Sequence, residues 1–284
     1  RVNAGLHVIA NRAIDEYLKL IGMKEDVRAT VSNAEILLIG YIAVSDFAGN
    51  YKKAHTYFWM IGCCKMLEYS RFIRRLNEME DLIEKLFRWL GDLFITLEDS
   101  HIYSVDSFPV ELCQITREKR CHLWRAPELK GFNASKCRFF YGLKVHMVVT
   151  TNKAPVRCYI SHGSMHDVKA SYKLLPQLPK NSLAIGDKGY VSSKLEAFLK
   201  RFEITLSPIA RHNMQKENKK DYLIKRRIRK GVETAFSMIT AKFGKVIKAT
   251  SIGGFLTKLK LFLTAYSIDC FLKLSDNNQK LVIN

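Results

Sequence analysis

The stretch Tyr141-Gly142-Leu143-Lys144-Val145-His146-Met147 alternates apolar side chains with glycine, lysine and histidine, and it runs on into Val148-Val149. Such alternation predicts a β-strand with one buried face, because successive side chains of a strand point to opposite sides. Residues 156–160 alternate likewise after a turn at 152–155, and 102–112 is another extended stretch, around Asp106. Three strands so close in sequence predict an antiparallel meander.

Helix and strand patterns alternate after this meander. Helices are predicted over 168–175 and 193–202, and short strands over 183–185 and 204–207. A further helix is predicted over 224–243, where apolar residues recur along one stripe. The sequence therefore predicts a mixed α/β domain, in which helices flank a mixed sheet, over residues 99–284.

The first part of the chain has helical patterns instead. Ser32 and Glu35 have the spacing of a capping box, which predicts the start of an apolar helix over 36–47. Apolar residues recur every three or four positions from Ser70 to about Leu97, which predicts one long amphipathic helix. We therefore expect residues 1–98 to form an all-α domain.

The charge of the chain is unevenly distributed. Of 284 residues, 46 are Lys or Arg and 27 are Asp or Glu, a net charge of +19. Residues 1–100 hold 13 basic and 14 acidic side chains, so the excess lies in 101–284. Such a field favours a polyanionic partner, most commonly nucleic acid, although a basic surface kept for solubility is the alternative.

The sequence argues against a membrane protein or a secreted one. No apolar run reaches the ~18–20 residues of a spanning helix, and the N-terminus lacks the pattern of a signal peptide. Residue 1 is Arg, so we expect the sequence to begin inside a longer chain. Seven cysteines, an odd number, suit a reducing compartment, and we expect a cytoplasmic protein.

Three acidic residues lie within or next to apolar segments, where a buried carboxylate needs an ion-pair partner or a metal ion. Asp106 interrupts a predicted strand, Asp187 follows another, and Glu233 lies on the predicted 224–243 helix one turn after Arg229. Each alone is more often a capping or ion-paired acid. Together they suit Mg²⁺ or Mn²⁺, since hard cations prefer oxygen ligands, and two such ions can catalyse an in-line phosphoryl displacement.

The order of short motifs resembles the ribonuclease-H-like DDE transposases of bacterial insertion sequences, most closely the insertion sequence 982 family. The resemblance runs over nearly the whole chain. The motifs that carry it are Ser32-Asn33-Ala34-Glu35, Ser70-Arg71-Phe72-Ile73-Arg74-Arg75-Leu76-Asn77, Val105-Asp106-Ser107, Gly131-Phe132-Asn133-Ala134-Ser135-Lys136, Phe140-Tyr141-Gly142-Leu143-Lys144-Val145-His146, Gly163-Ser164-Met165-His166-Asp167, Gly186-Asp187-Lys188-Gly189-Tyr190 and Arg229-Lys230-Gly231-Val232-Glu233.

The resemblance implies a ribonuclease-H-like catalytic domain in which Asp106, Asp187 and Glu233 are the catalytic, metal-binding triad. It implies binding of terminal inverted repeats, then metal-dependent hydrolysis and strand transfer of double-stranded DNA at element ends and target. Because two ends must be brought together, we expect a homodimer, associated with the bacterial nucleoid. A related group has Tyr, Arg and Lys around the glutamate. Here Arg229 fits, but Arg226 and Thr240 replace the other two, so the hairpin or base-flipping step of that group is not carried over.

Several further positions are predicted to contact DNA. Residues 211–248 hold twelve basic and three acidic side chains, so we expect the 224–243 helix and its preceding loop to lie along the DNA backbone. The segment around Arg71 is interpreted either as the start of a DNA-reading helix or as a solvated basic turn. The predicted contacts are Arg71, Arg74, Arg75, Lys188, Lys225, Arg226, Arg229 and Lys230, and His146, His166 and Asp167 are expected behind the metal ligands.

Two other functions compatible with these motifs stay open at this point. One is a ribonuclease-H-like nuclease that cuts DNA without joining strands. The other is a DNA-binding derivative that has lost catalysis, against which the intact triad argues. The segment 1–98 is then expected to bind element ends and to make dimer contacts, and 99–284 to catalyse.

Overall fold

The computed structural model describes residues 4–62, 65–134, 136–208, 219–243 and 246–282, with side chains described except at 4–7, 219 and 275–282. The chain divides into two compact units. Arg1–Leu90 and Ile239–Asn284 form one, here called the helical unit, and Gly91–Met238 form the other, the sheet unit. The last helix of the chain thus belongs with the N-terminal helices. The functional division between residues 98 and 99 stays a prediction.

The helical unit is built around α2 (Asn33–Asp46), which is buried on nearly all sides. Its start is the expected capping box, in which Ser32 Oγ accepts from the Glu35 amide at 3.1 Å and Glu35 accepts from the Ser32 amide at 2.7 Å. Helices from both ends of the chain pack on α2. They are α1 (Ala4–Leu20), α3 (Tyr51–Ile61), α4 (Tyr69–Glu78) and α9 (Ile252–Val282), and α5 (Glu80–Thr96) begins in this unit.

The single helix expected over 70–97 is wrong, since the structure has two helices there. Met79 ends α4 with φ −90° and ψ 13°, and α5 begins at Glu80. The apolar stripe nevertheless continues across the break, because Leu76, Met79 and Ile83 are all buried. Periodicity alone therefore could not show the break.

Among its described residues, the sheet unit has six strands, which form one mixed sheet. The expected meander is confirmed: β1 (Ile102–Cys113) pairs antiparallel with β3 (Arg138–Thr150), which pairs antiparallel with β4 (Pro155–His162). On the other side of β1, β5 (Leu183–Ile185) and then β6 (Thr205–Leu206) continue the sheet in parallel. The sequence did not predict β2 (Lys130–Asn133), which pairs with the start of β3.

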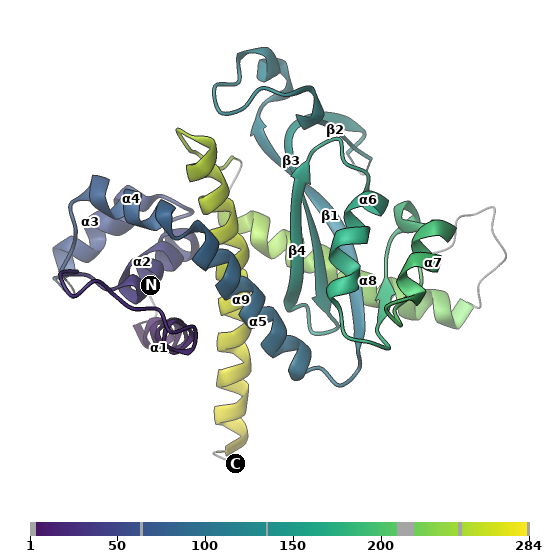
Figure 1. Ribbon diagram of the computed structural model, residues 1–284, viewed down its shortest axis with the longest axis horizontal. Coiled ribbons are helices and arrows are strands. Elements are labelled where there is room, and N and C mark those ends of the chain that lie inside the picture. The colour runs from purple at the N-terminus through teal and green to yellow at the C-terminus, as the bar shows by residue number, and fades with distance from the viewer. Residues whose placement is uncertain (1–3, 63–64, 135, 209–218, 244–245, 283–284) are drawn as a thin grey trace. The chain divides into compact units, whose positions relative to one another are not determined.

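Helices cover both faces of this sheet (Figure 1). In that view α6 (Asp167–Leu174) crosses in front of the strands and α8 (Lys219–Phe243) passes behind them, with α7 (Ser193–Lys200) beside α6. Short 3-10 helices complete the connections: η1 (Ile115–Arg120), η2 (Pro127–Leu129), η3 (Leu175–Gln177) and η4 (Lys188–Tyr190). A mixed, helix-flanked, ribonuclease-H-like sheet preceded by helices is the fold class that the sequence predicted.

Among the helices that the structure describes, none has an apolar stretch that could cross a membrane.

Candidate active site

Strand β1 presents its residues alternately to the two faces of the sheet. Asp106 and Phe108 therefore share one face, and the Phe108 ring lies 4.6 Å from the ring of Phe236 on α8. Ser107 lies on the other face, where its hydroxyl donates to Asp167 at the start of α6, at 2.7 Å. One strand thus places Asp106 toward α8 and Ser107 toward α6.

Asp187 reaches the same edge of the sheet because β5 runs parallel to β1. Ser104 pairs with Ile185, so Asp187, two residues past the end of β5, is level with Asp106 in the interior of β1. Asp187 then begins the 3-10 helix η4 in an extended conformation, with φ −75° and ψ 174°. The sequence Gly186-Asp187-Lys188-Gly189-Tyr190 therefore turns sharply as it leaves the sheet.

Arg229 on α8 connects two of the three predicted ligands. Its guanidinium donates to Asp187 Oδ1 at 3.0 Å and to Glu233 Oε1 at 2.7 Å. Glu233 lies one helical turn after Arg229, so both side chains emerge from the same side of α8. Asp187 and Glu233, which come from different elements, thus share this one cation, and its charge also acts on Asp106.

Asp106 is the least solvated acid of the three. Its burial raises its pKa to about 7, while the amide of Ser107, which donates to Oδ1 at 2.8 Å, and the charge of Arg229 oppose the rise. The negative charges of Asp167 and Asp187 raise the pKa of Asp106 further. These same three acids also raise the pKa of the fully buried Tyr190, whose burial is the main cause. Asp106, Asp167 and Asp187 are thus close enough to one another for their charges to interact.

The three acids fit a hard divalent cation by their chemistry, since all offer carboxylate oxygens. The distances between these side chains do not form a metal site as they stand. Within the described ranges, no three Asp, Glu, His or Cys side chains lie close enough together to hold a metal ion. Arg229 lies between two of these predicted ligands, Asp187 and Glu233, and pairs with both. A metal ion would therefore compete with a guanidinium for the same oxygens.

The expected polar group behind the triad forms only in part. His146 Nδ1 lies 3.4 Å from Asp167 Oδ1 and its Nε2 lies 2.9 Å from Ser161 Oγ, so His146 and Asp167 are brought together. His166 is exposed at the start of α6 and makes no capping bond with its side chain. Lys144 joins the group, since its ammonium lies 3.6 Å from Asp167. Sequence reasoning missed Lys144, Ser107 and Tyr190, although each stands in a motif quoted above.

The predicted DNA contacts occupy two separate places in the chain. Arg226 and Lys230 are exposed on α8, which also carries Lys225, and Lys188 follows Asp187. In the helical unit, Arg71, Arg74 and Arg75 line a hollow of about 310 Å³ together with Leu67 and Glu78.

Three details qualify these contacts. Arg75 has a structural task, because its guanidinium donates to Val31 O at 2.8 Å and to Asn33 Oδ1 at 2.6 Å. The apolar stripe expected along α8 is wrong at Ile224, which is 57% exposed, because burial begins further along the helix, around Val232. The loop expected to lie along DNA, residues 209–218, falls outside the described residues.

Comparison with known proteins gives a family match over the part of the chain that contains Asp106, Asp187 and Glu233. A family model described as "Transposase DDE domain" matches residues 97–244, just over half of the chain. No curated protein matches. Among solved structures, the fold is similar to that of the piggyBac transposase synaptic complex with hairpin DNA, at 12% identity and a TM-score of 0.44, covering 97% of this chain and 73% of that one.

Proposed function

The chain belongs to the transposase DDE domain family, whose enzymes cut and transfer DNA strands, and we propose that it is the transposase of a bacterial insertion sequence. It binds the terminal inverted repeats and hydrolyses a phosphodiester at each end. It then joins the freed 3′-end of the element to target DNA, through attack by the 3′-hydroxyl. The observation that carries this proposal is that Asp187 and Glu233 share Arg229, whose charge, with that of Asp187, also acts on Asp106. The likeness to the insertion sequence 982 family belongs to this proposal and is tested by the inverted repeats beside the gene.

The cofactor that the proposal requires is a pair of Mg²⁺ or Mn²⁺ ions, with Asp106, Asp187 and Glu233 as their ligands. When bound, such ions polarise the phosphodiester and stabilise the leaving oxygen. Each reaction step exchanges one P–O bond: water, and later a 3′-hydroxyl, forms a bond to phosphorus while the bond to the leaving oxygen breaks.

The residues of this chain prepare that reaction electrostatically. Arg229 holds the carboxylates of Asp187 and Glu233 toward each other until DNA and metal arrive. A phosphate of the DNA backbone is the natural new partner for this guanidinium, since Arg binds phosphate in a bidentate manner. On the opposite face of the sheet, Asp167 holds Ser107 and thereby steadies the strand next to Asp106.

DNA is held by basic side chains on two surfaces. Arg226, Arg229 and Lys230 on α8, with Lys225 and Lys188, contact the backbone near the scissile bond. The hollow lined by Arg71 and Arg74 on α4 binds a phosphate of the element end. The active species is a homodimer, because two ends have to be synapsed before transfer. The protein acts in the cytoplasm, on the nucleoid.

The test is cleavage and joining of a labelled duplex that carries the element end, in Mg²⁺. Asp187→Asn is expected to abolish both reactions while DNA binding persists. Asp221→Asn, an exposed acid at the start of α8, is the matched control and stays active. Full activity of Asp187→Asn would refute the assignment of the site.

A pre-cleaved end separates the transposase from a nuclease that only cuts. The transposase joins the free 3′-hydroxyl to target DNA, whereas the nuclease gives no joined product. An inactive DNA-binding derivative would bind the ends and give neither product. Sedimentation of the protein with end DNA tests the dimer, and a complex that stays at one chain while it cuts would contradict it.

A further inference from the structure

The β2–β3 hairpin of the sheet unit exposes two phenylalanine rings side by side. Phe132 and Phe139 are register partners across the two strands, and they are 51% and 56% exposed. Their ring centroids lie 5.2 Å apart at an interplanar angle of 63°. Exposing two neighbouring aromatic rings to water is unfavourable in free energy. A partner that covers this pair would remove that cost.

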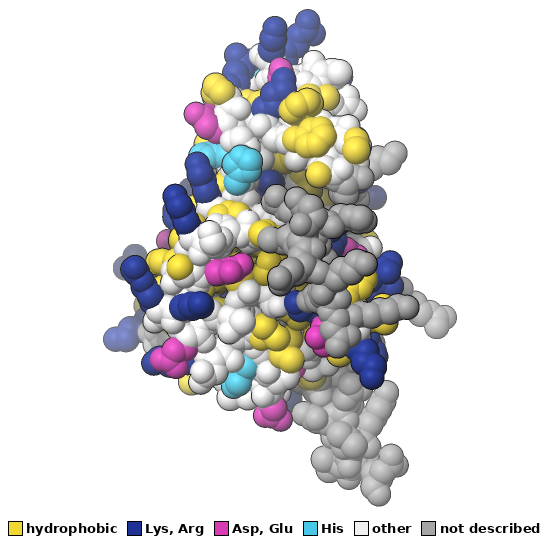
Figure 2. Space-filling view, turned by 90° about the vertical axis from the view of Figure 1, so that its right-hand side faces the viewer, with side chains coloured by type: hydrophobic (Ala, Val, Ile, Leu, Met, Phe, Trp, Pro, Cys, Tyr) yellow, Lys and Arg dark blue, Asp and Glu magenta, His cyan; other side chains and the backbone are white. Residues whose placement is uncertain are grey.

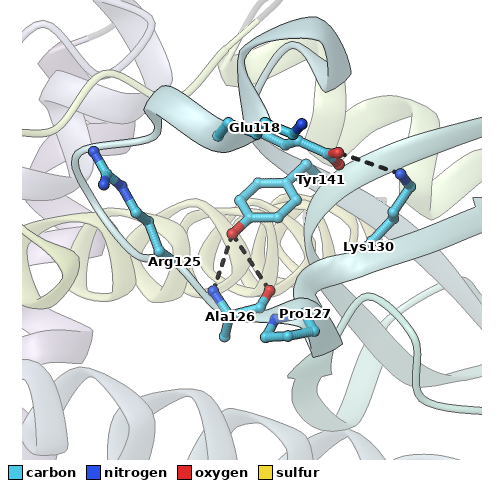
Figure 3. Close-up of a pocket in the computed structure, with 7 residues that line it drawn as sticks. Glu118, Arg125, Ala126, Pro127, Lys130 and Tyr141 are labelled. Carbon is cyan, nitrogen blue, oxygen red and sulfur yellow. Dashed lines mark hydrogen bonds and ion pairs between the residues drawn. The ribbon is translucent and has the colours of Figure 1, made fainter.

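Lys130 and Tyr141 extend the same face of the hairpin. They are the next register pair, two residues along from the phenylalanines, so all four side chains lie on one side of the two strands. The Lys130 ammonium lies 5.8 Å from the centroid of the Phe139 ring. Beyond it, Lys130 and Tyr141 line a hollow of about 450 Å³ together with Glu118, Lys119, Arg125, Ala126 and Pro127 (Figure 3).

This surface is held in place by bonds within the sheet unit. The Tyr141 hydroxyl accepts from the Ala126 amide at 3.0 Å and lies 3.3 Å from the carbonyl oxygens of Trp124 and Ala126. Arg125 Nε donates to Cys121 O at 2.9 Å, and Lys130 pairs with Glu118 at 3.3 Å. A partner would therefore meet a preformed surface and would lose little free energy in ordering it.

The charge of the segment identifies the kind of partner. Residues 114–138 contain seven basic side chains and two acidic ones. At the top of the view in Figure 2, the end of the sheet unit that carries η1 and β2 in Figure 1, Lys and Arg side chains lie above exposed hydrophobic ones. A second copy of this face would bring like charge, whereas a polyanion would be attracted.

We infer that this aromatic–basic face, made of Phe132, Phe139, Lys130 and the hollow beside Tyr141, binds unpaired nucleotides of single-stranded DNA. Bases stack on the two phenylalanines, and phosphates lie against Lys119, Arg125 and Lys130. Exposed aromatic rings beside cations suit single strands, because every unpaired base offers a face for stacking, whereas a duplex hides these faces. The inference rests on the proposed function for its source of DNA, which is the strand opened at an element end.

The test compares single-stranded and duplex DNA by fluorescence anisotropy, with labelled oligothymidine and a duplex of equal length, in buffer without divalent metal. Phe132→Ala with Phe139→Ala is expected to weaken binding of the single strand by at least about tenfold, since each stacked base contributes ~1–3 kcal/mol. Binding of the duplex is expected to change much less. The tyrosine pair, Phe132→Tyr with Phe139→Tyr, is expected to restore binding.

Phe202→Ala is the matched control. Phe202 is 38% exposed and also lies 5.2 Å from another ring, that of Phe198, but it is outside this face. Its substitution is expected to leave single-strand binding unchanged. Photo-crosslinking with 5-iododeoxyuridine in the single strand is expected to attach to the peptide that contains Phe132 or Phe139.

Unchanged affinity of the alanine variant would overturn the inference, and so would equal losses for single strand and duplex. A change of oligomeric state in that variant, with affinity retained, would show instead a contact between protein chains. The outcome is independent of the proposed function, because no metal is present and no strand is cut. If Asp187→Asn still cleaved DNA, the assigned active site would fail while the single-strand measurement stood.

Discussion

Arg229 is the residue on which the chemistry of the site depends most directly. Its guanidinium lies 3.0 Å from Asp187 and 2.7 Å from Glu233, two of the proposed metal ligands. Arg229→Gln removes that positive charge and leaves the two carboxylates to repel each other. We therefore expect the variant without DNA to bind Mn²⁺ several-fold more tightly than the wild type. Electron paramagnetic resonance of free Mn²⁺ measures this affinity.

Arg226→Gln is the control for that measurement. Arg226 lies on the same helix and carries the same charge, but no ion pair between it and the triad is present among the described residues. Its substitution is expected to leave the Mn²⁺ affinity close to that of the wild type. If Arg229→Gln bound Mn²⁺ no better than Arg226→Gln, the guanidinium would not be competing with the metal.

His146 predicts how stability depends on pH. Burial lowers the pKa of His146 to about 4, although the charge of Asp167 opposes this, and Lys144, Ser161 and Tyr159 are its other neighbours. Unfolded, a histidine has a pKa of about 6.5, so between pH 6.5 and 4 the unfolded chain binds more protons. The stabilisation is full above pH 6.5 and is lost as the pH falls toward 4, by up to about 3 kcal/mol.

His146→Asn is expected to flatten that part of the pH profile, measured as the midpoint of urea unfolding at each pH. His166→Asn is the control, because the side chain of His166 is exposed, whereas that of His146 is buried. A profile that His146→Asn left as steep as the wild type would assign the acid sensitivity to other groups.

The residue types of the proposed site could be predicted from the sequence, but the contacts between them could not. Asp106 and Asp187 stand out because they interrupt or follow apolar strands, a signal visible in the letters alone. The ion pair of Arg229 with Asp187 and the bond from Ser107 to Asp167 join residues 42 and 60 positions apart, and no periodicity encodes them. Sequence reasoning therefore gave residue types and order, while the contacts needed the fold.

Among the elements, the longer strands were predicted from the sequence, whereas the break between α4 and α5 was not. The residues of all three predicted strands do form strands, although burial follows one face only in β1: β3 is buried on both faces along most of its length, and the middle of β4 is only half-buried. The break at Met79 leaves no mark in the sequence, since the buried stripe continues through it. Strand β2 was missed because its four residues are too few for a period and Phe132 is exposed.

Two glycines test how tightly elements pack in the sheet unit. A Cβ at Gly131 in β2 would lie 2.2 Å from the Gly163 carbonyl oxygen and 2.6 Å from the Phe140 ring. Gly131→Ala is therefore expected to destabilise the fold by about 1–3 kcal/mol, because backbone would have to move. In α8, a Cβ at Gly231 would meet only Lys153 Cγ, at 3.6 Å.

Gly231→Ala is expected to have the opposite sign, a gain of roughly 0.5–1 kcal/mol, because alanine favours a helix interior. Urea unfolding of both variants against the wild type measures the two effects. A loss of stability in both would mean that α8 has no room at Gly231, and a loss in neither would mean that the hairpin yields easily.

For the whole molecule, the structure shows which elements carry the excess positive charge behind the net charge of +19. The residues from 101 on carry the excess, and the structure assigns part of it to α8 and part to the segment between β1 and β3. Acids are scarce there, so Asp106, Asp187 and Glu233 stand in a basic surrounding. Such a surrounding attracts the phosphate backbone toward the acids that are proposed to cut it.

The salt dependence of duplex binding measures how much of that charge touches DNA. Arg226→Gln with Lys230→Gln removes two exposed charges from α8, and Lys194→Gln with Lys200→Gln removes two from α7. Each lost phosphate contact lowers the slope of log K against log salt by about 0.9, so the α8 pair is expected to lower it by about 2 and the α7 pair by little. Equal slopes for both variants would mean that DNA responds to the total charge of the protein and does not lie along α8.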